Sequence, residues 1–126
     1  NSFTSVSLDP PMLLICIAKS ALSRGVFSEC EHFGVNILRN TQQDVSALFA
    51  SKSAEKFDKV DYEKSLHGTP VIKEPLANFV CRRQKSVDAG DHLVIFGEVI
   101  DFRSNDGSPL LYYNGDYCSI DQDRSE

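Results

Sequence analysis

The side chains best suited to chemistry lie at two junctions between predicted secondary-structure elements. His92 follows Gly90 and Asp91 at a turn-to-strand junction, where the backbone can approach a ligand and the imidazole can face a cleft. An imidazole gains or loses a proton near neutral pH, so it suits ligand orientation or proton transfer. Lys19 ends an apolar run just before a predicted helix, whose free N–H groups would bind an anion beside the ammonium. The alternatives are a structural histidine and a plain surface lysine.

The opening stretch, residues 1–11, is rich in hydroxyl side chains and has no initiator methionine. We expect it to be the exposed middle of a ligand-binding strand whose upstream half is missing. Ser2 and Thr4 share one face of such a strand, but Val6 continues that face as an apolar residue. A β-bulge near Ser5 is therefore expected, and such breaks often lie beside ligands. A plain hydroxyl-rich edge strand explains the pattern equally well.

Strands and helices should alternate through the first half of the chain. Residues 12–18 are continuously apolar, which favours a strand buried on both faces. A helix is expected next, with Ser20 as its N-cap and with Leu22, Val26 and Cys30 spaced four apart on its buried stripe. The apolar residues change from a continuous run to a spacing of four residues, and this change marks the boundary between the strand and the helix.

Residues 33–38 return to a strand pattern, and a second helix should follow. We expect Thr41 to be its N-cap, with the acidic Asp44 favoured by the helix dipole. Gln42 and Asp44 should serve capping and local hydrogen bonds. The buried face of this helix should consist of Val45, Leu48 and Phe49.

Two long strands, 77–87 and 92–103, should dominate the second half of the chain and be joined by a turn at 88–90. The second strand has little polar face, so it should be central in its sheet. Smaller features are a short helix followed by irregular chain over 51–69, a short strand at 71–72, a turn at 105–107, a closing strand at 110–113 and a polar tail at 119–126. The sum is a mainly β domain over 1–118, most economically a small barrel with two or three helices.

Composition excludes several classes of function. The chain has 126 residues and a net charge of −5, so a nucleic-acid surface is not expected, and the basic cluster 82–85 reads as a solvated strand end. No apolar run approaches the roughly 20 residues of a membrane span. Cys16, Cys30, Cys81 and Cys118 form no C-x-x-C pair, which disfavours zinc. Cys16 and Cys81 read as buried thiols of a reducing compartment, the cytoplasm.

Five segments, taken in order, carry a resemblance to a known family. They are N-S-F-T-S-V-S-L-D-P-P at 1–11, the apolar strand ending in Lys19-Ser20, F-G-V-N-I-L with Q-Q-D-V-S-A-L-F-A over 33–50, G-D-H-L-V-I-F-G-E-V at 90–99 and P-L-L-Y-Y-N-G-D-Y at 109–117. With them the chain resembles the flavin reductase-like family, the small NAD(P)H:flavin oxidoreductases that feed two-component monooxygenases. The resemblance implies a split β-barrel that dimerises, with flavin near the subunit interface.

The resemblance also implies roles for single residues. The catalytic candidate is His92, which would lie by the nicotinamide, while Asp91 supports the turn. Contacts to the flavin ring would come from Asn1, Ser2 and Ser7, and contacts to its phosphate from Cys16, Ile17, Ala18, Lys19, Ser20 and Ser23. Further flavin contacts would come from Leu48, Phe49, Tyr112, Tyr113, Asn114 and Gly115, although the tyrosines could equally serve barrel packing. His32 and His67 should be surface residues, and no metal is expected.

We therefore expect a flavin reductase that transfers a hydride from NADH or NADPH to FMN or FAD and supplies reduced flavin to a partner monooxygenase. Alternatives are a flavin-binding module without turnover, an inactive truncated fragment and, more remotely, a pyridoxamine-phosphate oxidase-like barrel, which the G-D-H segment disfavours. One departure from the family pattern is the lack of a preceding helix and two strands. The apolar pair at 21–22, where the family has polar residues, is another.

Overall fold

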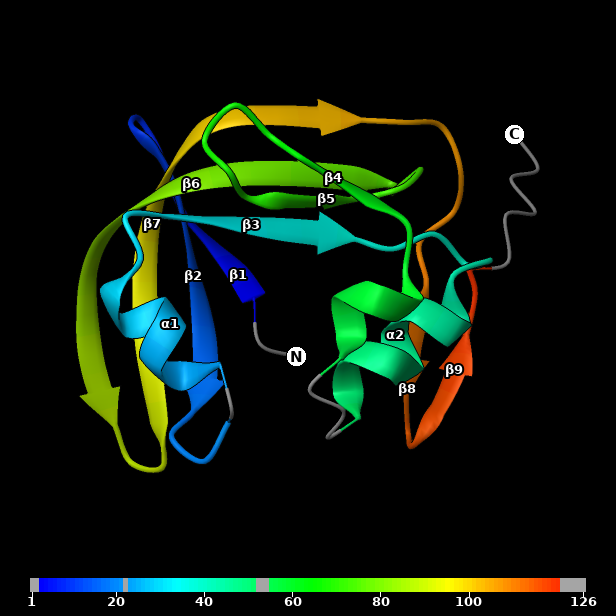
Figure 1. Cartoon of the computed structure of the whole chain (residues 1–126), viewed down its shortest axis with the longest axis horizontal. Helices are drawn as coiled ribbons and strands as arrows, with labels where there is room; N and C mark the ends of the chain where they lie inside the picture. Colours follow the sequence, from blue (N-terminus) through cyan, green and yellow to red (C-terminus); the bar gives the residue numbers. More distant parts are fainter. Residues whose placement is uncertain (1–2, 22, 52–54, 121–126) are drawn as a thin grey trace.

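The main feature of the fold, in a computed structural model that describes residues 3–21, 23–51 and 55–120, is a five-stranded antiparallel sheet. Its strands, in spatial order, are β1 (Phe3–Leu8), β2 (Pro11–Ala18), β7 (His92–Ser104), β6 (Ala77–Ala89) and β3 (His32–Ile37). The two long strands β6 and β7 bend as they cross the molecule (Figure 1). β7 lies at the centre, as its nearly continuous apolar sequence predicted.

Smaller elements flank this sheet. They are α1 (Arg24–Glu29), α2 (Gln43–Ala50), the 3₁₀ turn η1 (Lys56–Lys59), the hairpin of β4 (Tyr62–Lys64) with β5 (Pro70–Ile72), and the hairpin of β8 (Leu111–Tyr113) with β9 (Asp116–Cys118). In Figure 1, α2 lies beside the β8–β9 hairpin on one side of the molecule and α1 lies on the other. The mainly β fold is confirmed. The described strands form three separate sheets and none closes on itself, so the split barrel stays a prediction.

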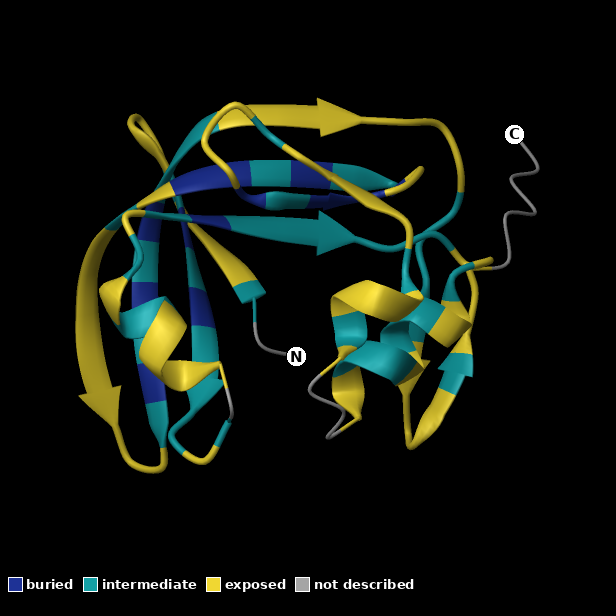
Figure 2. Ribbon diagram, in the orientation of Figure 1, coloured by how far each residue is buried: buried dark blue, intermediate teal, exposed yellow. Residues whose placement is uncertain are grey.

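One face of the large sheet carries the hydrophobic core. Its buried members are Leu13, Ile15, Phe33, Cys81, Leu93 and Ile95, and Figure 2 shows the buried residues gathered along β2, β7, β6 and β5. Burial raises the pKa of the Cys81 thiol to about 12, as expected of an inert core thiol. The expected burial of β2 on both faces is wrong, because Leu14 and Cys16, on its other face, are only half-buried.

The helix expected from Ser20 begins later. Lys19 and Ser20 form a turn instead, in which Ala21 N donates to Ala18 O at 2.9 Å. The N-cap position of α1 falls at Ser23, so Ser20 is not the cap. Leu22 lies outside the described residues. The expected apolar stripe is also wrong in part, since Val26 is 69% exposed.

The second helix also begins one step later than predicted. Its N-cap position is Gln42, not Thr41. The side chain of Gln42 accepts a hydrogen bond from Arg39 N at 2.8 Å and donates one to Lys73 O at 2.9 Å. These bonds fix the chain before α2, and they confirm the predicted local role of Gln42.

Three further expectations concern strands. The bulge is confirmed, because Ser5 pairs with Leu13 while Ser7 pairs with Met12, leaving Val6 extra. Part of the segment 51–69, expected to be irregular, forms β4 and pairs with β5. The chain at 110–113 does not close the main sheet. It folds back on β9, a hairpin that Asn114 and Gly115 allow with φ angles of 53° and 85°.

Two expectations about the surface have mixed outcomes. His67 is exposed as expected, but His32 is partly buried, and their rings stack with centroids 4.5 Å apart. This contact joins the β4–β5 hairpin to the start of β3.

Within the described ranges, no helix has the length and apolar character needed to span a membrane.

Candidate functional site

The ends of β2, β6 and β7 bring several candidate residues together. Ala18 pairs with His92 across β2 and β7, and Lys19 N donates to Asp91 O at 2.9 Å. The ammonium of Lys19 lies 3.4 Å from the Asp88 carboxylate. In Figure 1 the loop after β2 and the turn between β6 and β7 lie at the same end of the sheet. This end of the sheet therefore holds an ammonium, two carboxylates and an imidazole.

The imidazole of His92 is oriented by its neighbour in sequence. Its Nδ1 lies 2.7 Å from Asp91 Oδ1, and its side chain is 44% exposed. The pKa of Asp91 is lowered mainly by this hydrogen bond and next by the charge of His92. When Nδ1 donates to the carboxylate, Nε2 is the ring nitrogen left to meet a ligand.

Two backbone N–H groups near the predicted anion site at Lys19 already have partners. Lys19 N donates to Asp91 O in the turn between β6 and β7, Ala21 N donates to Ala18 O, and α1 begins only at Arg24. These two N–H groups are therefore not available to an anion beside the Lys19 ammonium. What remains is the Lys19 ammonium with the exposed residues Ser20 and Ser23.

A groove of about 400 Å³ separates the sheet from α2 and the β8–β9 hairpin. Ile17 and Tyr112, both predicted from the sequence, line it. One wall is held by Tyr117, whose hydroxyl donates to Ser46 Oγ at 3.0 Å. The other lining residues are Phe3, Ile15, Phe27, Gly34, Val35, Asn36, Ile37, Leu38, Leu110 and Leu111. The groove offers apolar walls with a few polar groups, which is typical of small-molecule sites.

Most of the groove residues, Ser46 and Tyr117 among them, were not among the sequence-based candidates. A signal for Tyr117 was present. The Asn114-Gly115 dipeptide indicates a two-residue hairpin, and that hairpin pairs Tyr112 with Tyr117. Cross-strand partners share one face, so Tyr117 could have been placed beside Tyr112. Nothing in the local sequence indicates Ser46.

Strand alternation divides the remaining candidates between the two faces of the sheet. Ile15 and Ile17 face the groove, so their neighbours Cys16 and Ala18 face the other way. Partners across β2 share that outer face, and they include His92, paired with Ala18, and Ser7, paired with Met12. One group of candidates therefore lines the groove, and a second group lies on the outer face.

The other candidates lie on α2 and on the β8–β9 hairpin. Phe49 lines an apolar cavity of about 290 Å³ and packs edge-on against Phe57, with ring centroids 5.2 Å apart. Leu48 is half-buried on the same helix. Tyr113 is 77% exposed, and it precedes the turn residues Asn114 and Gly115. Asn1 and Ser2 lie outside the described residues.

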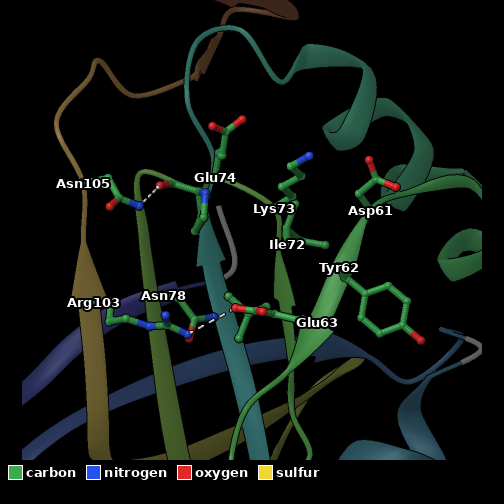
Figure 3. A pocket seen from close by; sticks show the side chains of 11 residues that line it. Asp61, Tyr62, Glu63, Ile72, Lys73, Glu74, Asn78, Arg103 and Asn105 are labelled. Carbon is green, nitrogen blue, oxygen red and sulfur yellow. Dashed lines mark hydrogen bonds and ion pairs between the residues drawn. The ribbon is translucent and has the colours of Figure 1, made fainter.

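A separate hollow of about 610 Å³ lies between the β4–β5 hairpin and the ends of β6 and β7. Figure 3 shows charged side chains of both signs around it, with Arg103 directed at Glu63, 3.7 Å away. Asn105 donates to Pro75 O at 2.8 Å. No pattern in the sequence indicated this hollow. Across the described part of the chain, no three His, Cys, Asp or Glu side chains are grouped to hold a metal ion.

Comparison with known proteins gives consistent matches. Residues 1–121 match the family model described as flavin reductase like domain. The chain is 45% identical over 115 residues to the FMN reductase (NADH) SmoA of Agrobacterium fabrum, covering 91% of this chain and 66% of that protein. It is 42% identical over 117 residues to the stachydrine N-demethylase reductase subunit Stc3 of Rhizobium meliloti, covering 93% of this chain and 51% of that protein. The chain thus spans between about half and two thirds of these relatives.

A solved structure extends the comparison to the fold. The NADH:FAD oxidoreductase SgcE6 of Streptomyces globisporus C-1027, solved with NAD and FAD fragments, matches with a TM-score of 0.94 and 32% identity. The match covers 99% of this chain and 77% of that one.

Proposed function

Because the chain belongs to the flavin reductase-like domain family, we propose that it forms the ligand-binding domain of an NAD(P)H-dependent flavin reductase. The reaction moves a hydride from NADH or NADPH to FMN or FAD. The observation that carries the proposal is the arrangement at the end of β2, where Ile17 lines the groove on one face of the sheet, the Lys19 ammonium follows in the chain, and the oriented imidazole of His92 lies on the outer face. Such a domain needs no nucleophilic side chain, because nicotinamide and flavin supply the hydride chemistry themselves.

The groove fits a flavin ring in size and character. Its lining combines apolar side chains such as Phe3 and Ile17 with the aromatic, polar side chain of Tyr112, which suits a flat ring with one apolar and one polar edge. At the strand end Lys19, assisted by Ser20 and Ser23, would hold the flavin phosphate. When bound, the flavin would supply the hydride-accepting chemistry. The protein contributes alignment and the exclusion of water.

We assign His92 to the dinucleotide. Its Nε2 is free to donate or accept because Asp91 holds Nδ1, and its side chain is accessible enough to reach a ligand. This imidazole would orient the nicotinamide or move a proton at Nε2. Asp91 would act through His92 as a positioning residue.

We also propose a homodimer and a split barrel. The outer face of β2 and β7 carries Leu14, Val94 and Phe96, which are apolar but only half-buried. A second copy would cover this face, placing Cys16 and His92 near the subunit interface. Light scattering should give twice the monomer mass, and Val94→Glu should reduce it toward the monomer. Val26→Glu, on the exposed face of α1, is the matched control.

The activity is tested by following NADH oxidation at 340 nm with FMN, FAD or riboflavin added in turn. A flavin-dependent rate is expected, and its absence with all three flavins would refute the enzyme proposal. Reduced flavin would then serve a partner monooxygenase. A coupled assay, in which a flavin-dependent monooxygenase depends on this protein for turnover, tests that step.

A further inference from the structure

Lys19, the residue assigned to the flavin phosphate, already has an anionic partner. Its Nζ lies 3.4 Å from Asp88 Oδ1. Asp88 stands one residue before the end of β6, so the partner comes from another strand and not from the Lys19 loop. From the sequence alone, Asp88 was expected only to take part in the turn at 88–90.

The geometry of the loop restricts where the Lys19 ammonium can go. Its backbone is fixed, since Lys19 N donates to Asp91 O at 2.9 Å and Ala18 pairs with His92. Its side chain is 35% exposed, whereas that of Asp88 is 76% exposed. The nearby Asp91 carboxylate is engaged by His92 at 2.7 Å. Asp88 is therefore the carboxylate that contacts the ammonium directly.

We propose that Asp88 competes with the flavin phosphate for Lys19 and so sets the preference between phosphorylated and unphosphorylated flavins. The inference rests on the proposed function. An ammonium that binds a phosphate monoester must give up much of its contact with Asp88, and the phosphate must approach a second anion. The binding of FMN is weakened by this competition, whereas the binding of riboflavin, which has no phosphate, is not.

The expected size of the effect is modest. Both side chains are partly exposed, and pairs of this kind are weak because water and salt screen them. Replacing Asp88 by Asn keeps the shape and removes the charge. From the energy of exposed ion pairs, Asp88→Asn should raise the affinity for FMN by about two- to five-fold. The change should shrink as salt is added.

The experiment is a fluorescence titration of the full chain with FMN and with riboflavin. Wild type, Asp88→Asn, Lys19→Ala and the double variant Lys19→Ala/Asp88→Asn are compared. Asp101→Asn is the matched control, because Asp101 is an exposed carboxylate on β7 whose removal changes the net charge equally. Asp88→Asn should tighten FMN without altering riboflavin, and Asp101→Asn should alter neither. In the Lys19→Ala background the effect of Asp88→Asn on FMN should largely disappear.

Three results would overturn the inference. Unchanged or weaker FMN binding by Asp88→Asn would show that the carboxylate does not compete. If Asp88→Asn changed riboflavin affinity equally, or still changed FMN affinity in the Lys19→Ala background, Asp88 would act through folding or through charge repulsion that does not involve Lys19. If the wild-type protein binds FMN and riboflavin while the variants give one of these results, the inference fails but the proposed function stands. Wild type that binds neither flavin removes the proposed function together with the inference.

Discussion

The role of His92 separates two properties that usually change together, the affinity for flavin and the rate of reduction. His92→Ala should lower flavin-dependent NADH oxidation by about a hundred-fold, the lower end of what a positioned acid or base contributes. The dissociation constant for FMN should change little, because His92 is assigned to the dinucleotide. His67→Ala is the control, since that exposed histidine lies on the β4–β5 hairpin. Equal losses in rate and in flavin affinity would contradict the assignment.

Asp91 provides a pH test of the same contact. Its pKa lies below the ordinary value of 3.8, mainly because of the hydrogen bond with His92. A depressed pKa means that the contact stabilises the fold above the unfolded value and is lost as pH falls through the folded value. The part of this stabilisation that depends on the ionisation of Asp91 therefore stays constant between pH 5 and 8, where the carboxyl is ionised in both states. A carboxyl carbon NMR titration should show the low midpoint, and His92→Ala should raise it toward 3.8.

At the scale of elements, β7 depends on having no side chain at Gly97. A Cβ there would lie 2.6 Å from Phe33 Cζ and 2.9 Å from Cys81 Cβ. Gly97→Ala should therefore destabilise the protein by about 1–3 kcal/mol, as overpacking does in other cores. Urea denaturation measures this. A Cβ at Gly25 in α1 would meet no atom of the described residues within 4 Å, so Gly25→Ala should be neutral or stabilising.

The β8–β9 hairpin is joined to α2 by the hydrogen bond from Tyr117 to Ser46. Tyr117→Phe should cost about 0.5–1.5 kcal/mol, the net value of such a bond. The edge-on packing of this ring against Tyr112 should survive, because the aromatic ring remains. Amide exchange in β8 and β9 should accelerate. Tyr113→Phe, which changes a largely exposed ring, should leave exchange as in the wild type.

The sequence predicts those elements whose own residues dictate them. The central place of β7 follows from its apolar run, and the bulge at Val6 follows from a break in the polar face. The helix starts predicted at Ser20 and Thr41 are wrong, because the chain before α1 is held by backbone hydrogen bonds of Lys19 and Ala21 and the chain before α2 by the Gln42 side chain. Sequence patterns identify a capping residue type but not a competing bond.

The candidate site shows the same division. Lys19 and His92 were singled out by their local context, and the structure brings both to one end of the sheet. The Lys19–Asp88 contact was not foreseen, because it depends on which strands meet at that end. The division of Ile17 and His92 between opposite faces depends on strand register in the same way. Long-range register is the information that a single sequence does not display.

At the scale of the whole molecule, the groove connects the two ends of the described chain. Phe3 on β1 and Tyr117 on β9 both line it, with residues of β2, α1, β3, α2 and β8 between them. A ligand that fills the groove therefore contacts elements that are distant in sequence. Its binding energy should stabilise the whole fold, since a ligand that binds only the folded state shifts the equilibrium by mass action.

This coupling gives a prediction that does not depend on turnover. FMN at 100 times its dissociation constant should raise the free energy of unfolding by about 2.7 kcal/mol. Amide exchange should slow in β1 and β2 and also in β8 and β9, because the ligand contacts both sets. Riboflavin at the same degree of saturation should protect the same strands, since it carries the same ring. Protection confined to the Lys19 loop would mean that the phosphate binds there while the ring lies outside the groove.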